Sequence, residues 1–321
     1  MFEQFYKRIS IPKKDIQALM SKVAADYHIG KYLSHKIIPV GYEDFNAILE
    51  TDLGKYFIKV FASFRSLENI QRYIAIIEHV LRAGVKHPQL LESTNTHFRT
   101  ICVNSKQVSI CLMGYIDGKT FYEWKSKPTK EERKLLIKQA ALINKIDFHP
   151  SYIPDSWSVD RFLQEYGKKR AFLKPQDQKT IDPIATEFSK LQIKKLPHAL
   201  VHGDLISTNI MRNKNGKLYI IDFSVANWYP RIQELAVLFC DLMFDPENLR
   251  SFQDTYKWTI AEYQKYIKLT AEEMAALPIY TRTAHAMHII GATWERSQGN
   301  TEGENNHWLI LGRKGLELTL K

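Results

Sequence analysis

Cysteine is scarce in this chain and follows no metal-binding or disulfide pattern. Three cysteines occur in 321 residues, and no two of them form a Cys-x-x-Cys pair. An odd number of cysteines without metal-ligand spacing argues against a disulfide framework and against a zinc finger. We therefore expect a protein of the reduced cytoplasm.

Long apolar runs are also missing. No stretch approaches the roughly 20 apolar residues that a membrane-spanning helix needs, and no signal peptide with an apolar core is present. No repeat or low-complexity segment occurs either. We expect a globular protein without membrane contact, because an apolar content of 45% with 12% aromatic residues is ample for a packed core.

The patterns of nucleic-acid-binding proteins are absent as well. The net charge is +10, but the Lys and Arg residues are spread along the chain in pairs. No arginine-rich arm and no RNA-binding aromatic motif occurs. We expect these charges to form solvated faces, and we expect no nucleic-acid partner.

The chemistry of the chain is concentrated in the stretch Leu200–Phe223. It reads LVHGDLISTNIMRNKNGKLYIIDF, which is an apolar run, a Gly-Asp turn and two short strands. The pair Asn215 and Gly216 predicts a two-residue hairpin loop between the strands. That register sets Asn209 directly across from Asp222.

Asn209 and Asp222 are the candidate metal ligands. Cross-strand neighbours lie about 4.5–5.5 Å apart at Cβ, so an amide oxygen and a carboxylate can share one cation. Mg²⁺ prefers such hard oxygen ligands and completes its shell with water and nucleotide phosphates. Asp204 precedes the hairpin, where its carboxylate can accept a proton from an attacking hydroxyl.

The spacing of these three residues resembles a known catalytic segment. Asn209 follows Asp204 by five positions, and Asp222 follows thirteen positions later. This resembles the protein-kinase-like fold, and the His-Gly-Asp triplet is similar to the aminoglycoside phosphotransferase, choline kinase and homoserine kinase group. The resemblance implies ATP and Mg²⁺ as cofactors, Asp204 as the catalytic base, and Asn209 and Asp222 as metal ligands.

The same resemblance implies an α+β fold with two lobes. We expect residues 1–113 to form a small antiparallel-sheet N-lobe and residues 114–321 a larger, mainly helical C-lobe. The patterns agree, with alternating strands over 47–50 and 56–61 and helical spacing over 13–27 and 66–83. We expect residues 120–148 to form one helical stretch.

The strand pair from Gly41 to Phe61 resembles the amino-terminal part of type II homoserine kinases. By that resemblance the loop at Gly41 approaches the nucleotide phosphates, and Lys59 on the second strand neutralises them. This chain departs from the usual Gly-hydrophobic-Glu-Asn-Thr-Asn run at two positions, because Asp44 replaces an Asn and Phe45 replaces a Thr.

The helix after Lys59 lacks its usual glutamate. In aminoglycoside kinases that residue pairs with the lysine, and here its position falls near Tyr73 or Ile74. Glu68 and Glu78 are the alternatives, and we favour Glu78. Met113 is expected at the hinge that reads adenine.

Residues 231–245 are similar to the helix that follows the metal-binding aspartate in this group. Glu234 stands where Asp is usual, and we expect it to brace the catalytic loop. Asp241 and Asp245 are candidates for the acceptor cleft, although an exposed polar face is an equal alternative.

We expect an ATP-dependent phosphotransferase that moves the γ-phosphoryl group to a hydroxyl of a small metabolite. The acceptor would be an amino alcohol such as homoserine or choline, or an aminosugar. A protein Ser/Thr kinase and a non-catalytic nucleotide-binding relative are the alternatives.

Overall fold

The computed structural model of the chain describes residues 3–38, 44–248, 252–300 and 303–319. The chain divides into two units. The first comprises residues 1–82, 86–118 and 213–219, and the second comprises residues 83–85, 119–212 and 220–321. The expected lobe boundary between residues 113 and 114 stays a prediction.

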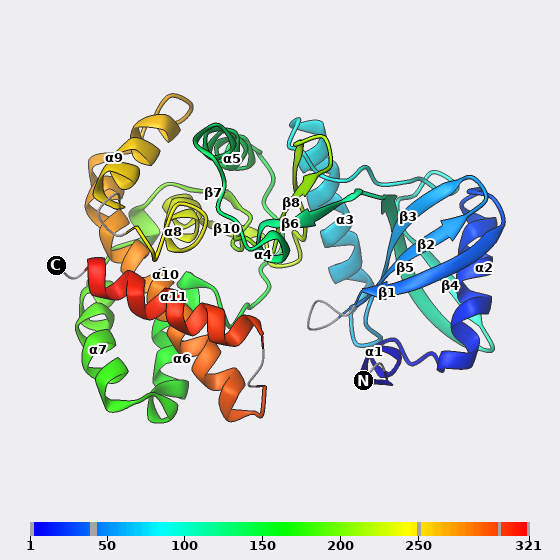
Figure 1. Cartoon of the computed structure of the whole chain (residues 1–321), viewed down its shortest axis with the longest axis horizontal. Helices are drawn as coiled ribbons and strands as arrows, with labels where there is room; N and C mark the ends of the chain where they lie inside the picture. Colours follow the sequence, from blue (N-terminus) through cyan, green and yellow to red (C-terminus); the bar gives the residue numbers. More distant parts are fainter. Residues whose placement is uncertain (1–2, 39–43, 249–251, 301–302, 320–321) are drawn as a thin grey trace. The chain divides into compact units, whose positions relative to one another are not determined.

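An antiparallel sheet of five strands forms the first unit (Figure 1). Its strands, in spatial order, are β1 (Tyr32–Ile38), β2 (Phe45–Thr51), β3 (Gly54–Val60), β5 (Lys106–Gly114) and β4 (Arg99–Val103). The alternation of apolar residues predicted β2 and β3, and a tight turn joins these strands as expected. Alternation is the pattern of a strand with one buried face.

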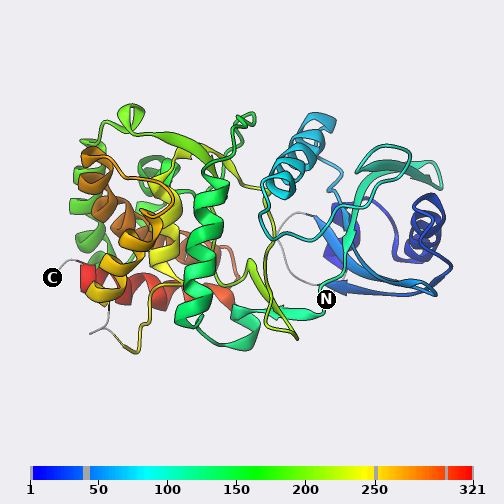
Figure 2. The ribbon, with the colours of Figure 1, turned by 90° about the horizontal axis from the view of Figure 1, so that it is seen from above.

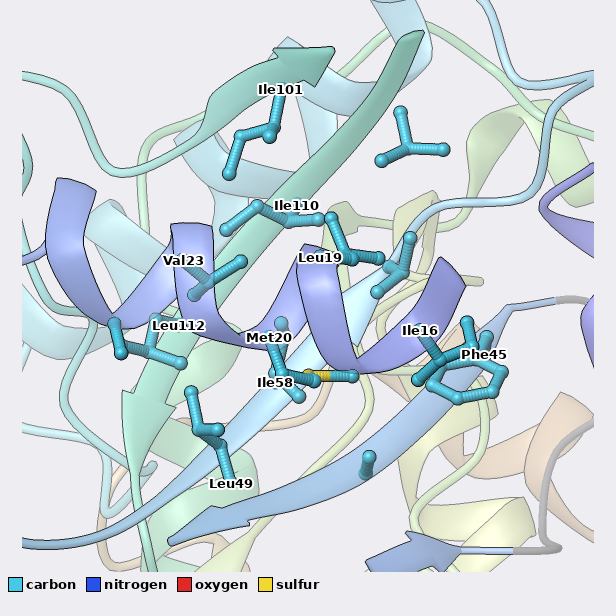
Figure 3. Packing of buried hydrophobic residues seen from close by; sticks show 14 of the residues in the cluster. Ile16, Leu19, Met20, Val23, Phe45, Leu49, Ile58, Ile101, Ile110 and Leu112 are labelled. Atoms are coloured by element: carbon cyan, nitrogen blue, oxygen red, sulfur yellow. The ribbon is translucent and has the colours of Figure 1, made fainter. Parts of the chain in front are cut away.

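Helix α2 (Ile16–Asp26) packs on one face of this sheet (Figure 3). Its residues at helical spacing are almost completely buried, which confirms the predicted amphipathic helix. In β3, Ile58 and Val60 belong to this same core. Because successive strand residues point to opposite faces, the intervening Lys59 points away from α2.

Helix α3 (Leu67–Arg82) agrees with the predicted span to within one residue at each end. The Tyr73 ring on this helix meets the Phe61 ring edge on, with the centroids 5.6 Å apart. The helix ends before Gly84, whose φ of +79° favours a residue without Cβ. A short helix, α1 (Glu3–Arg8), precedes α2.

The second unit is mainly helical, as predicted. Its helices are α4 (Phe121–Trp124), α5 (Lys130–Ile143), α6 (Phe162–Lys169), α7 (Pro175–Ser189), α8 (Ile232–Cys240), α9 (Phe252–Tyr263), α10 (Ala271–Ser297) and α11 (Glu304–Thr319). Helix α10 packs along α8 and α11 (Figures 1 and 2). None of the helices in the described ranges has an apolar stretch long enough to span a bilayer.

The prediction of one helical stretch over residues 120–148 is wrong. Helix α4 ends at Lys125, which has a left-handed φ of 49°. Thr129 then starts α5 with a capping box, because its hydroxyl accepts from the Glu132 amide while the Glu132 carboxylate accepts from the Thr129 amide. This second start signal divides the stretch.

Short strands frame the stretch Leu200–Phe223. Strand β7 (His198–Val201) pairs with β10 (Asn227–Pro230), and β8 (Ile210–Asn213) lies between β6 (Gly118–Thr120) and β9 (Leu218–Ile220). The loop from β7 to β8 therefore has both ends fixed by hydrogen-bonded strands.

Candidate active site

The loop between β7 and β8 starts from a buried strand. Leu200 and Val201 are completely buried, so the packing of β7 fixes where the loop begins. Gly203 has a φ of +83°, a conformation that favours glycine, and it turns the chain toward Asp204. The polar residues of the loop thus follow directly from an apolar anchor.

Asp204 and Asn209 are in direct contact. The Asn209 side-chain amide donates to the Asp204 carboxylate at 2.7 Å and to the Asp204 main-chain oxygen at 2.9 Å. Burial, together with the charges of Asp155 and Asp222, raises the pKa of Asp204 to about 8, while the Asn209 hydrogen bond opposes this shift. The loop therefore presents a carboxyl whose pKa lies close to neutral pH.

The hairpin that carries Asn209 has a different register from the predicted one. The Gly216 amide donates to the Asn213 oxygen and the Asn213 amide donates to the Lys217 oxygen, so the loop has three residues. The Ile221 amide donates to the Asn209 oxygen at 2.9 Å. Asn209 therefore lies opposite Ile221, and Asp222 is one residue beyond that pair.

Asp222 has a left-handed backbone, with a φ of 62°. Such a φ is uncommon for a residue other than glycine and is often associated with functional sites. The Ser224 hydroxyl donates to the Asp222 carboxylate at 2.6 Å. After burial and the charge of Asp155, the charge of Asp222 also contributes to the raised pKa of Asp204.

His202 connects the Asp204 loop with the residues just before Asp222. Its Nε2 atom donates to the Ile221 oxygen at 3.1 Å, and its Nδ1 atom accepts from the Asp204 amide at 3.2 Å. Burial lowers the pKa of His202 to about 4, so the imidazole is neutral and can both donate and accept. No separate role was predicted for this histidine from the sequence.

Two carboxylates of the α8 region hold the loop. Glu234 accepts a hydrogen bond from the His202 amide at 2.7 Å, which confirms the predicted contact. Asp241 was expected either to face the acceptor cleft or to lie on an exposed polar face, and both expectations are wrong. It is completely buried, and its carboxylate accepts from the Ser207 amide at 2.6 Å and from the Lys127 ammonium at 3.0 Å.

Aromatic and acidic side chains lie next to the loop. The Tyr122 amide donates to the Ser207 oxygen at 3.1 Å. The Tyr122 ring stacks on Trp308 with a centroid distance of 6.3 Å. Burial raises the pKa of Tyr122 and the charge of Glu304 raises it further, and Glu304 is also among the groups that raise the pKa of Asp204.

Magnesium would find oxygen ligands at Asn209 and Asp222. The carboxylates around Asp204 raise its pKa, and a cation would offset that repulsion, so the donor set fits Mg²⁺. Within the described ranges, no three His, Cys, Asp or Glu side chains converge as metal ligands. An ion held here would complete its shell with phosphate and water.

In the first unit, Lys59 does not meet the predicted partner. Its ammonium donates to the Asp44 carboxylate at 3.0 Å. The Glu78 carboxylate instead accepts from His97 at 2.7 Å, so the expected pairing of Lys59 with Glu78 is corrected. Glu68, the other candidate, is exposed on α3.

The remaining nucleotide-binding candidates stay predictions. Gly41 lies outside the described residues. Met113 is buried in β5 opposite Phe57 of β3, and the next residue, Gly114, donates its amide to the Gln89 oxygen at 2.9 Å.

The chain is similar to known proteins along most of its length. Residues 34–266 match the model of a family described as phosphotransferase enzymes. Homoserine kinase from Zymomonas mobilis subsp. mobilis is 22% identical over 276 residues, which cover 83% of this chain and 82% of that protein.

Solved structures resemble the fold of the chain. Spectinomycin phosphotransferase bound to ADP and spectinomycin has a TM-score of 0.67 at 15% identity, covering 95% of this chain and 97% of its own. The microcompartment-associated aminopropanol kinase has a TM-score of 0.65 at 13% identity, covering 94% and 96%. These similarities confirm the predicted protein-kinase-like fold class.

Proposed function

Because the chain belongs to the phosphotransferase enzyme family, we propose that it transfers the γ-phosphoryl group of ATP to a hydroxyl of a small metabolite that carries an amine. It is a small-molecule kinase. The finer assignments concern the catalytic residues, the metal and the amine. They rest chiefly on one observation, the contact between the Asp204 carboxylate and Asn209.

Asp204 is the proposed proton acceptor. A general base works best when its pKa lies near the working pH. Burial and neighbouring carboxylates raise the pKa of Asp204 to about 8, well above the usual range of an aspartate. The Asn209 amide orients the carboxylate toward the acceptor hydroxyl, and Glu234 and Asp241 fix the loop that carries it.

Asn209 and Asp222 are the proposed ligands of Mg²⁺. When bound, such a cation neutralises charge on the transferring phosphoryl group. Ser224 holds the Asp222 carboxylate, and His202 ties the strand before Asp222 to the loop of Asp204. Lys59 is the proposed partner of the nucleotide phosphates.

Negative charge next to Asp204 supports an acceptor with an ammonium group. The charges of Asp155 and Glu304 both act on Asp204. After burial, the charge of Glu304 also contributes to the raised pKa of Tyr122, whose ring stacks on Trp308. A carboxylate beside aromatic faces suits a small cation. Homoserine and aminopropanol, the acceptors named for two of the similar proteins, both carry an amine.

A protein Ser/Thr kinase is the weaker alternative. Residues 223–231, between Asp222 and α8, contain the strand β10 and leave no room for a long activation segment. A non-catalytic relative is disfavoured because Asp204, Asn209 and Asp222 are all present.

Coupled measurement of ADP release tests the proposal. The acceptors would be homoserine, choline, ethanolamine, 1-amino-2-propanol and spectinomycin, with 1,2-propanediol as the amine-free match of 1-amino-2-propanol. We expect acceptor-dependent ADP release with at least one amine and much less with the diol. Equal ADP release with 1-amino-2-propanol and 1,2-propanediol would contradict the proposal that the acceptor needs an amine. No ADP release with any acceptor would contradict the proposal that the protein is a kinase of amino alcohols and aminosugars.

A further inference from the structure

Lys59 is almost completely buried, and a buried ammonium needs a counter-charge. Its side chain is 7% exposed. Burial without a partner would favour the neutral amine, because desolvation penalises the charged form. A neutral amine would no longer attract phosphate. Whatever carboxylate contacts Lys59 therefore controls its charge as well as its position.

Asp44 supplies that carboxylate from the position just before β2. Its side chain is 4% exposed. One oxygen accepts from the Lys59 ammonium at 3.0 Å, and the other accepts from the Arg65 guanidinium at 2.8 Å and from the Ala62 amide at 3.0 Å. Burial alone would raise the pKa of Asp44, but the charges of Lys59 and Arg65 and the Ala62 hydrogen bond outweigh it and lower the pKa to about 2. Asp44 is thus negatively charged at neutral pH.

The two departures in the sequence meet at this point. By resemblance, Asp44 stands where type II homoserine kinases usually have a neutral Asn. Tyr73 stands near the position where aminoglycoside kinases usually have the helix glutamate. In the structure, the Tyr73 ring lies 5.4 Å from the Lys59 ammonium. Tyr73 on α3 thus contacts Lys59 without supplying a charge, while Asp44 supplies a negative charge.

We propose that Asp44 is the positioning residue of Lys59 in nucleotide binding, and that it replaces the missing helix glutamate. One carboxylate holds two cations, Lys59 and Arg65, so two positive side chains lie together at this point and suit an anionic ligand. A lysine that is already held in place loses less rotamer entropy when it meets phosphate. This inference rests on the proposed function.

Asp44→Asn tests the proposal through nucleotide affinity. The variant removes the charge and keeps the size, and we expect roughly ten- to hundredfold weaker binding of AMP-PNP by calorimetry. The KM for ATP should rise in parallel, while the KM for the acceptor should stay the same. Glu50→Gln is the matched control, because it breaks an exposed ion pair with Lys55 on the same two strands and should change neither constant.

Relocating the charge separates positioning from general damage. In the double variant Asp44→Asn with Tyr73→Glu, the helix again carries a carboxylate beside Lys59, and we expect much of the nucleotide affinity to return. A purely structural role of Asp44 would give no such recovery. Asp44→Glu covers the case in which Asp44→Asn does not fold, because it keeps the charge and should still weaken binding by moving the ammonium.

The outcomes are distinguishable. Wild-type protein that binds AMP-PNP while both Asp44 variants bind it equally well would overturn the role of Asp44 and leave the proposed function intact. Failure of Tyr73→Glu to restore binding would also count against positioning. Wild-type protein that binds no nucleotide would overturn the proposed function, and this inference with it.

Discussion

The side chain of Asn209 donates a hydrogen bond of 2.7 Å to the carboxylate of Asp204. The proposed proton acceptor and a proposed metal ligand thus touch each other. Because the same amide also donates to the Asp204 main-chain oxygen, Asn209 fixes both the backbone and the side chain of the base. A change at Asn209 should therefore affect both proton transfer and metal binding.

Asn209→Ala should lower kcat/KM for ATP by roughly a hundredfold or more, because it removes a metal ligand and releases Asp204. Steady-state kinetics at a series of Mg²⁺ concentrations would measure this, and the Mg²⁺ required for half-maximal rate should rise. Asn215→Ala, an exposed change in the hairpin loop, is the control. Unchanged Mg²⁺ dependence in Asn209→Ala would remove Asn209 from the metal site.

Lys127→Met should destabilise the second unit. It leaves the completely buried Asp241 carboxylate without its cation, and the free energy of unfolding should fall by about 3 kcal/mol. Denaturant unfolding measures this. Lys134→Met, which breaks an exposed pair with Glu131, should change the free energy by less than about 1 kcal/mol. If both changes lower the free energy of unfolding equally, the buried pair contributes no more stability than the exposed pair.

The stability that Asp44 contributes should fall as the pH is lowered. Its pKa of about 2 lies below the usual 3.8, so the unfolded chain takes up the proton first as the pH falls. The contribution is complete above about pH 5, and about 2 kcal/mol of it is lost by about pH 2.

Denaturant unfolding at several pH values, in wild type and Asp44→Asn, measures this dependence. The gap between their free energies of unfolding should narrow as the pH falls below about 4. A gap that stays constant over the whole pH range would contradict the assigned pKa.

Gly315→Ala should destabilise the contact of α10 with α11. A Cβ atom at Gly315 would overlap the imidazole of His285, which is completely buried, so the free energy of unfolding should fall by about 1–3 kcal/mol. Gly167→Ala on α6 is the matched control. No atom lies within 4 Å of its Cβ position, and alanine should stabilise that helix by about 0.5–1 kcal/mol. Thermal unfolding would show shifts of opposite sign, and shifts of the same sign would contradict the tight crossing.

Hydrophobic periodicity was sufficient to predict most of the elements. The buried face of α2 and the alternation of β2 and β3 follow from local spacing, since burial of one face is what defines such elements. The His-Gly-Asp triplet and the spacing of Asn209 and Asp222 predicted which residues belong to the candidate active site.

Competing side-chain contacts account for the error in the hairpin register. The Asn213 side chain accepts from the amides of Asn215 and Lys217, which closes a three-residue loop with Gly216 in a left-handed conformation. An Asn-Gly pair alone predicts the shorter loop.

Tertiary pairing of charges was not predictable from local pattern. Asp44 precedes β2 while Lys59 lies on β3, and Lys127 lies far in sequence from Asp241. Each pair forms because a buried charge needs a partner, and the fold decides which partner is in reach. The departure at Asp44 was the one signal in the sequence for its pairing.

The most direct test of the account compares Asp204→Asn with wild type in phosphoryl transfer and in AMP-PNP binding. We expect the rate of transfer to fall by roughly a thousandfold, because the proton acceptor is removed, while nucleotide affinity stays within about twofold. Asp147→Asn, at a fully exposed carboxylate, is the control and should match wild type. A wild-type rate from Asp204→Asn would contradict the central claim that this carboxylate accepts the proton.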